Sequence, residues 1–136
     1  MFERKNSKQT GKRIDSLIGA GTTVNGDVTF VGGLRIDGTV NGNVATVNGE
    51  TGTLVVSEHA RVDGEIRVSH VVVNGAVNGP VVAGDFLELQ AKAKVTGDLE
   101  YRSLEMHTGA VVQGRLRHVE PGTASVVELK RAGAEG

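Results

Sequence analysis

The chain of 136 residues contains no cysteine and no tryptophan, and it has only one tyrosine, three phenylalanines and two prolines. Without cysteine it can form neither a disulfide nor a thiolate metal site. With so few aromatic side chains, a core has to be filled by Val, Leu, Ile and Ala. Small β-branched residues suit narrow layers of stacked strands better than a core built on large side chains. The composition therefore favours one all-β domain.

Long apolar stretches are also missing. No run approaches the ~20 apolar residues that a transmembrane helix requires. The basic N-terminus is not followed by the ~7–15 apolar residues of a secretory signal, and Phe2 stands where N-myristoylation requires glycine. The net charge of −1 gives no reason to expect a nucleic-acid partner. We therefore expect a cytoplasmic protein.

Glycine is abundant, with 20 copies, and it marks an internal repeat. An apolar residue is followed two positions later by glycine, and two positions after that by another apolar residue. The triplet occurs at Val24-Gly26-Val28, Val40-Gly42-Val44, Val62-Gly64-Ile66, Val77-Gly79-Val81, Val95-Gly97-Leu99 and Val112-Gly114-Leu116. The glycines are separated by 16, 22, 15, 18 and 17 residues. Six copies within so narrow a range of spacings identify a repeat protein.

Within each repeat the apolar positions alternate, which indicates strands of about three to five residues rather than helices. A unit of this size cannot bury its apolar face alone, so neighbouring copies have to stack. We predict a single-domain β-solenoid of about six short triangular coils, on the order of 30 Å long at ~4.8 Å per coil. The Asn-Gly pairs would each suit a β-hairpin, but most recur at one phase of the repeat, where a solenoid corner needs positive φ.

The repeat divides the chain into three parts. Residues 14–118 are the predicted solenoid domain. Residues 1–13 and 119–136 lack a strand pattern, and we expect both to be disordered tails. The segment Ala45–Thr53 accounts for the one 22-residue step, and we expect it to protrude as a loop.

The opening of the repeat resembles the bactofilin family. The stretch IDSLIGAGTTVNGDVTFVGGLRIDGTVNGNV, residues 14–44, fits the pattern I-G-x-G-x-x-[VI]-x-G-[DN] at 18–27 and G-x-x-x-I-D-G-x-[VI]-x-G at 32–42. Bactofilins are bacterial cytoskeletal proteins. The resemblance covers about residues 14–118 and implies a right-handed β-helix that polymerises end to end, without nucleotide, into filaments that lack polarity. It also implies inner-membrane attachment through an N-terminal peptide and the scaffolding of cell-wall enzymes or other morphogenetic proteins.

The two ends of such a solenoid carry unpaired strand edges, which are templates for pairing with another chain. Monomeric solenoids cover these ends with caps, and this sequence shows no amphipathic helical segment at either end. We therefore predict that copies of this chain stack head to head and tail to tail. The predicted contact residues are Leu17, Ile18, Val24 and Phe30 at one end and Leu104, Met106, Val112 and Leu116 at the other. The alternative for each of them is that it merely fills a terminal coil.

The first 13 residues concentrate positive charge. They hold five cations against Glu3, whereas the rest of the chain holds 10 cations and 15 anions. A basic residue contributes ~1 kcal/mol near an anionic leaflet, and a buried Met or Phe roughly 1.5–3 kcal/mol, so one tail binds weakly and a filament of tails binds by avidity. The predicted residues for binding anionic inner-membrane lipids are Met1, Phe2, Arg4, Lys5, Lys8, Lys12 and Arg13. The alternative is a solubilising leader without a target.

The sequence offers no motif for catalysis, cofactor binding or metal binding. His59, His70, His107 and His118 lack a metal-ligand spacing, and no phosphate loop supports nucleotide binding. We predict a protein that is not an enzyme and holds no cofactor. The main alternative is a left-handed β-helix hexapeptide-repeat acyltransferase, but three hexapeptides per coil would hold every step at 18 residues. A secreted carbohydrate-binding β-helix would need a signal peptide and more aromatic side chains.

Overall fold

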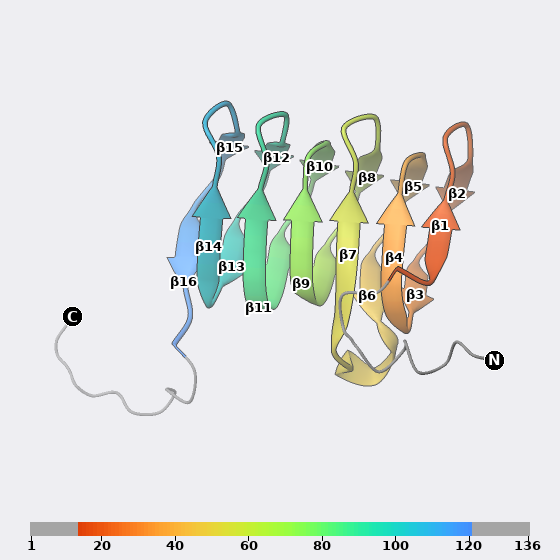
Figure 1. Ribbon diagram of the computed structural model, residues 1–136, viewed down its shortest axis with the longest axis horizontal. Helices are drawn as coiled ribbons and strands as arrows, with labels where there is room; N and C mark the ends of the chain where they lie inside the picture. Colours follow the sequence, from red (N-terminus) through yellow and green to blue (C-terminus); the bar gives the residue numbers. More distant parts are fainter. Residues whose placement is uncertain (1–13, 121–136) are drawn as a thin grey trace, which may run out of the picture.

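A computed structural model describes residues 14–120, which wind into six coils of three short strands each. Every strand pair in these residues is parallel, and each strand pairs with its counterpart in the next coil (Figure 1). In Figure 1 the near strands run upward while the chain advances from right to left, so the winding is right-handed. The predicted all-β, right-handed β-solenoid is confirmed, and the parallel pairing excludes a set of β-hairpins.

The three sides of the solenoid are each a flat ladder of strands. The first face contains β1 (Ser16–Ile18), β4 (Gly32–Ile36), β7 (Gly52–Val56), the second half of β9 (Ile66–Val73), the second half of β11 (Val81–Leu89) and β14 (Ser103–Met106). The second face contains β2 (Thr23–Asn25), β5 (Thr39–Asn41), β8 (Arg61–Asp63), β10 (Ala76–Asn78), β12 (Lys94–Thr96) and β15 (Val111–Gln113). The third face contains β3 (Val28–Phe30), β6 (Val44–Thr46), the first halves of β9 and β11, β13 (Leu99–Tyr101) and β16 (Leu116–His118).

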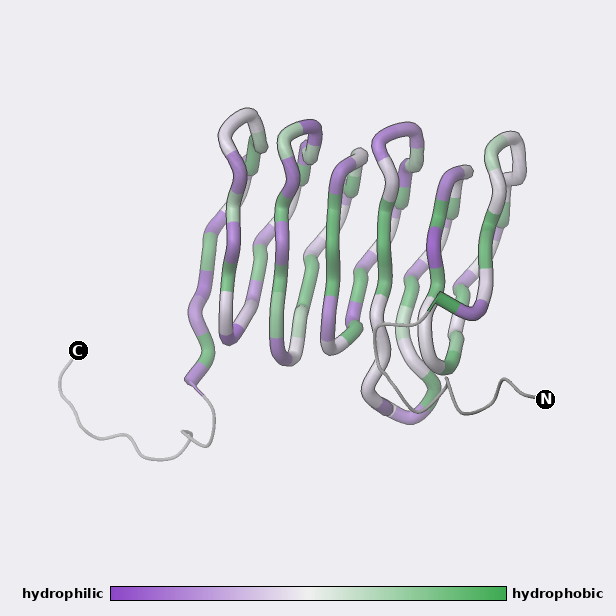
Figure 2. Tube along the Cα trace, in the orientation of Figure 1, coloured by the Kyte–Doolittle hydropathy of each residue, from purple (hydrophilic) through white to green (hydrophobic). Residues whose placement is uncertain are grey.

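The core is a set of apolar rows that run along the solenoid axis. One row on the first face stacks Leu34, Leu54, Val71 and Leu87, and these side chains are buried. Alternate residues of the same strands point outward, because successive side chains of a strand face opposite ways. Figure 2 shows the resulting change between hydrophobic and hydrophilic residues along each coil. The alternation of apolar residues in the sequence therefore determines which side chains form the core.

The glycines of the repeat triplet lie where two successive coils approach most closely. A Cβ built on Gly42 would lie 2.1 Å from the carbonyl oxygen of Gly26, and one on Gly64 would lie 2.1 Å from that of Gly42. The corresponding distance is 2.3 Å at Gly79 and 2.0 Å at Gly114. These positions accept glycine alone, because a side chain would collide with the backbone of the preceding coil.

The corner after the first face varies in length without disturbing the strands. It has two residues at Asp37-Gly38 and at Asn74-Gly75, whereas Ser57–Ala60 and Gln90–Ala93 have four. Backbone hydrogen bonds between coils continue through both kinds of corner. For example, the amide of Asp37 donates to the carbonyl oxygen of Ile18 at 2.7 Å. Removing two residues keeps every neighbour on its original face, so the core rows remain aligned.

The protruding loop is shorter than the predicted segment Ala45–Thr53. Ala45 and Thr46 belong to β6, and Gly52 and Thr53 belong to β7, because these residues pair with the preceding coil. The protruding part is Val47–Thr51, which begins with a short 3-10 turn, η1 (Val47–Gly49), where Asn48 has a φ of 52°. Figure 1 shows it extending beyond the neighbouring coils.

Strand β16 ends at His118, which is the last residue of the predicted solenoid domain. The amide of Val119 donates to the carbonyl oxygen of Tyr101 at 2.8 Å, so the third face continues just past residue 118. The expected disorder of residues 1–13 and of 121–136 concerns segments outside the described residues, and it stays a prediction.

Candidate functional site

The N-terminal end of the solenoid is an open edge. Strands β1, β2 and β3 each pair with one neighbour, in the second coil, and no segment of residues 14–120 covers their other side. Ile18, Val24 and Val28 point toward the interior of this first coil and are half-buried, although the rows to which they belong are fully buried one coil later. The interior of the fold therefore reaches solvent at this end.

The C-terminal end has the same character. Strands β14, β15 and β16 pair with the fifth coil alone among the described residues. Met106 is 45% exposed and Leu116 is 44% exposed, whereas their counterparts one coil earlier, Leu89 and Leu99, are completely buried. Leu104 and Val112 are half-buried beside them. These four residues are the ones predicted at this end, and they lie together on the last coil.

The other two residues predicted at the N-terminal end, Leu17 and Phe30, also lie on the first coil, but their side chains are placed differently from those of Ile18 and Val24. Leu17 is 60% exposed, but it alternates with the inward-facing Ile18 and points out from the first face. Phe30 is only 7% exposed, since Thr46 pairs beside it and Gly52 lies close to its ring. Phe30 therefore offers little surface to a second chain, while Ile18 and Val24 do lie at the open end. Val28, which the prediction omitted, joins them.

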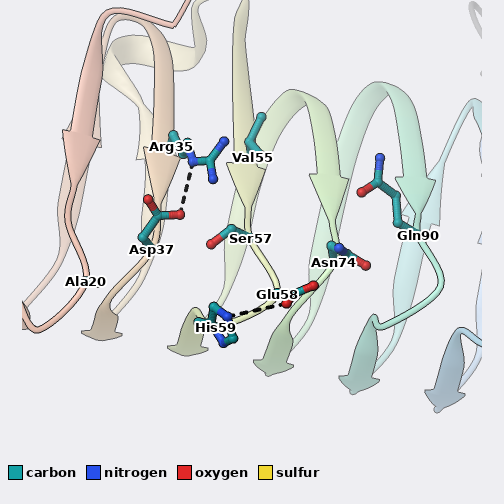
Figure 3. Close-up of a pocket in the computed structure, with 9 residues that line it drawn as sticks. All are labelled: Ala20, Arg35, Asp37, Val55, Ser57, Glu58, His59, Asn74 and Gln90. Atoms are coloured by element: carbon teal, nitrogen blue, oxygen red, sulfur yellow. Dashed lines mark hydrogen bonds and ion pairs between the residues drawn. The ribbon is translucent and has the colours of Figure 1, made fainter.

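A shallow depression of about 480 Å³ lies on the corner after the first face. Figure 3 shows its lining: Ala20, Arg35, Asp37, Val55, Ser57, Glu58, His59, Asn74 and Gln90. The Arg35 Nε donates to Asp37 Oδ1 at 3.0 Å, and His59 Nε2 lies 3.3 Å from Glu58 Oε2. The Ser57 hydroxyl donates to the Ile36 carbonyl oxygen at 3.0 Å. The bond from Ser57 joins this corner to the coil before it, whereas the Arg35–Asp37 and His59–Glu58 contacts lie within single coils.

Charged and polar side chains bind neighbouring coils to one another at the corners. The Asn78 side chain donates to Asp63 Oδ1 at 2.7 Å, and Arg61 Nε lies 3.1 Å from Asp63 Oδ2. The bond from Asn78, followed by that from Arg61, holds the pKa of the Asp63 carboxyl below its usual value. The pKa of Asp37 is lowered in the same way, by hydrogen bonding from Ser57 and from Arg35. The Ser57 hydroxyl carries one hydrogen, so it serves either Asp37 or the Ile36 carbonyl at a given moment.

The spacing of His and acidic residues in the sequence did not reveal one cluster of possible metal ligands. His107 Nε2 lies 2.9 Å from Glu88 Oε2 and 3.3 Å from Glu105 Oε2, at the C-terminal end of the first face. The stacking of β11 on β14 brings these residues together, so the signal was the repeat register rather than a short motif. The side chain of His107 is 41% exposed and that of Glu105 is 56% exposed, and hydrogen bonding of the imidazole with a carboxylate accounts for the arrangement without an ion.

The predicted membrane-binding residues, Met1, Phe2, Arg4, Lys5, Lys8, Lys12 and Arg13, lie outside the described residues. No helix that is long and apolar enough to cross a bilayer occurs in residues 14–120.

A right-handed solenoid of parallel strands with apolar interior rows open at both ends defines a class of proteins built to stack on further strands. The family model described as Bactofilin, "Polymer-forming cytoskeletal", matches residues 16–117. The chain belongs to the bactofilin family. It is similar to Bactofilin BacO of Myxococcus xanthus (strain DK1622), with 28% identity over 115 residues that cover 85% of each chain. No solved structure matches the chain.

A polymer-forming family agrees with strand edges that residues 14–120 leave uncovered at both ends. Membership of a structural, cytoskeletal family also favours the prediction that the protein is not an enzyme. The left-handed acyltransferase alternative fails on handedness and on the variable coil length.

Proposed function

We propose that the protein assembles end to end, head to head and tail to tail, into non-polar filaments that require no nucleotide. The observation that carries this proposal is the exposure of the interior rows at both ends, seen at Met106 and Leu116 on the last coil and at Ile18 and Val24 on the first. Each open strand edge also presents backbone donors and acceptors to a partner strand. A second copy stacked on each end would bury the exposed apolar side chains and pair the open backbone groups of the edge strands.

We infer that each end contacts the same end of another copy, because the two ends differ in composition. Three interior rows end at the C-terminus in the large, flexible Leu104, Met106 and Leu116, whereas three end at the N-terminus in Ile18, Val24 and Val28. Two identical ends related by a two-fold axis bury the same residues on both sides. A filament whose contacts alternate between the two kinds of end has no polarity.

We further propose that the filament lies on the inner membrane and localises cell-shape or cell-wall factors there. The basic segment of residues 1–13, with Met1 and Phe2 at its tip, supports the membrane part through weak binding repeated along a filament. End-to-end stacking leaves the three outer faces accessible, and these are the surfaces on which a client protein would bind.

The test of assembly is negative-stain electron microscopy of the purified protein without nucleotide, beside two variants of the last coil. Leu116→Arg places a charge on the interior row at the open end, and we expect it to give short oligomers instead of filaments. Val111→Arg is the matched control: Val111 is 46% exposed on the same coil but points out from the second face, in register with Lys94. Filaments from Leu116→Arg, or their loss in Val111→Arg alone, would contradict end-to-end assembly.

The membrane part has a separate test. Co-sedimentation with vesicles that contain anionic lipid should pellet the parent, and a variant in which Arg4, Lys5, Lys8, Lys12 and Arg13 are replaced by Gln should remain in the supernatant. Vesicles of neutral lipid alone serve as the control. Equal pelleting of both proteins by anionic vesicles would refute the role of the basic segment.

A further inference from the structure

The outer side of the first face carries a row of residues whose character changes in order along the axis. The row consists of Leu17, Arg35, Val55, Val72, Glu88 and Glu105, which stack in register from the first coil to the sixth. A cation is followed by two valines and then by two carboxylates. All six point away from the core, because the residues on either side of them face inward.

This order makes the face complementary to itself. A two-fold axis parallel to the strands, placed between β7 and β9, turns the solenoid axis end for end. Val55 of one copy then faces Val72 of the other, and Arg35 faces Glu88. The axis applies to both copies at once, so each contact occurs twice. Leu17 and Glu105, which are not complementary, fall at the rim.

The adjacent outward row matches under the same axis. It contains Gly33, Thr53, His70 and Phe86 on the four central strands. Under this axis Thr53 comes opposite His70 and Phe86 opposite Gly33. Thr53 is only 7% exposed and Gly33 is buried, so the half-buried His70 and Phe86 supply most of the surface of this row. A depression of about 450 Å³ lined by Thr53, His70, Val72, Phe86 and Glu88 lies on this part of the face. The first row therefore pairs opposite charges across the axis, and the second row adds the half-buried His70 and Phe86 to the contact.

The charged members of the pair keep capacity for a further contact. Arg35 is half exposed and binds Asp37 through Nε, and its terminal nitrogens are additional donors. Glu88 Oε2 accepts from Gln90 Nε2 at 3.3 Å and lies 2.9 Å from His107 Nε2. A carboxylate has about four acceptor positions, so these contacts do not exhaust it. Figure 3 shows Arg35, Val55, Asn74 and Gln90 along one side of this face.

The second face lacks this self-complementarity. Its corresponding outward row runs Thr23, Thr39, Arg61, Ala76, Lys94 and Val111. An axis between β8 and β10, in the position used for the first face, pairs Arg61 with Ala76 and Thr39 with Lys94, so no opposite charges meet. An axis through Ala76 places Arg61 opposite Lys94, which is a repulsive pair of like charges. The row also lacks neighbouring apolar residues at its centre.

We propose that the first face is a lateral contact between two copies of this chain, arranged antiparallel and face to face, so that filaments associate in pairs. Four strands at ~4.8 Å and the outward rows that they carry give a footprint of about 250 Å² per subunit, well below the ~800 Å² per partner of a stable interface. A single pair of subunits is therefore weak, and the contact gains strength by repetition along two filaments. The face-to-face contact does not depend on the end-to-end assembly proposed above, whereas the pairing of filaments rests on that assembly.

Charge reversal tests the face in assembled protein. Arg35→Glu changes the net charge from −1 to −3, and Glu88→Arg changes it to +1. We expect each variant alone to form single filaments, because the first places two carboxylates opposite each other across the axis and the second places two guanidinium groups opposite each other. Mixing preformed filaments of the two variants restores both attractive contacts, so pairs should reappear in electron micrographs. The double variant, which exchanges the two charges, should also pair.

The matched control separates this geometry from a general effect of net charge. Lys94→Glu and Glu100→Arg change the net charge by the same amounts on the second and third faces. We expect each of these to form pairs on its own. Single filaments from the parent at every ionic strength, or pairs from Arg35→Glu alone equal in number to those of the parent, would overturn the proposal.

Crosslinking tests the same geometry even if no filament forms, which keeps it distinct from a failure of end-to-end assembly. Because one pair of subunits is weak, it is carried out at high protein concentration, where the irreversible crosslink traps transient contacts. The chain has no cysteine, so an introduced thiol is unique. A short bismaleimide should crosslink a mixture of Arg35→Cys and Glu88→Cys into dimers. Neither variant alone should crosslink, because identical positions lie about three strand spacings apart, ~14 Å, along the axis. Equal crosslinking in the mixture and in the single variants, or none in the mixture, would refute the face-to-face contact.

Discussion

Gly42→Ala should destabilise the solenoid strongly, although it adds a single methyl group. The new Cβ would lie 2.1 Å from the Gly26 carbonyl oxygen, 2.4 Å from its carbonyl carbon and 2.9 Å from Asp27 N. All three are backbone atoms of the first coil, so no side chain can move aside. The first two coils would have to separate at this corner.

The cost follows from what this separation disturbs. Gly26 N donates to Asn41 O at 3.0 Å, Val28 N donates to Asn43 O at 2.8 Å, and Asn43 N donates to Asp27 Oδ1 at 2.9 Å. Adding a methyl group to a well-packed site costs about 1–3 kcal/mol, and strained hydrogen bonds bring this case to the upper end. A loss of about 3 kcal/mol would lower Tm by roughly 12–24 °C in a domain of this size.

The assay is urea and thermal unfolding followed by far-UV circular dichroism, in a Leu116→Arg background so that assembly does not add to stability. Gly84→Ala is the matched control, because a Cβ there meets Ser69 Cα at an ordinary 3.6 Å. We expect this control to be neutral or slightly stabilising, since alanine restricts the unfolded chain. A free energy of unfolding for Gly42→Ala within about 0.5 kcal/mol of its parent would show that the coils are not held at this separation.

Three further outcomes are expected. Leu54→Ala removes a fully buried side chain from the middle of a core row and should cost about 2–5 kcal/mol in urea unfolding; a loss below ~1 kcal/mol would contradict the packing. Asp63 has a lowered pKa in the folded state, so the stability that its charge provides is present above the usual carboxyl pKa near 4 and is lost as pH falls through the folded-state value. Asp63→Asn should therefore reduce stability at pH 7 and flatten the decline between pH 5 and pH 2, and unchanged pH profiles would refute this. Leu116→Arg should leave the chain folded, with the far-UV circular dichroism spectrum of the parent and a cooperative thermal transition, because Leu116 is 44% exposed; loss of that spectrum would mean that the variant acts through folding instead of assembly.

The sequence was sufficient for the fold because each coil repeats the same alternation. Leu54, Val71 and Leu87 occupy equivalent positions in successive copies, and they form one buried row. The triplet glycines also lie at equivalent positions, which fixes the register between coils. The extent of the protruding segment was overestimated, because Ala45, Thr46, Gly52 and Thr53 have no close counterparts in the repeat frame and yet pair with the coil before them.

The ends were harder to predict than the core. Strict alternation from Ile18 would have placed Leu17 outside, but hydrophobicity alone made it a candidate for the interface. Phe30 was assigned to the end because it belongs to the first coil, and its burial depends on where Thr46 and Gly52 lie. The cluster of Glu88, Glu105 and His107 required the register of two strands that are far from adjacent in the chain.

The variable corners have a consequence for how such a protein can change over time. Because each inner coil contacts only the coil before it and the coil after it, a gene duplication that adds one coil would lengthen the rod by ~4.8 Å and leave both ends as they are. In the proposed non-polar filament the N-terminal ends meet in pairs, so the number of coils would set the distance between successive pairs of N-terminal segments. Subunits of different length could then display the same segments at different densities, with no change in the contacts that join them.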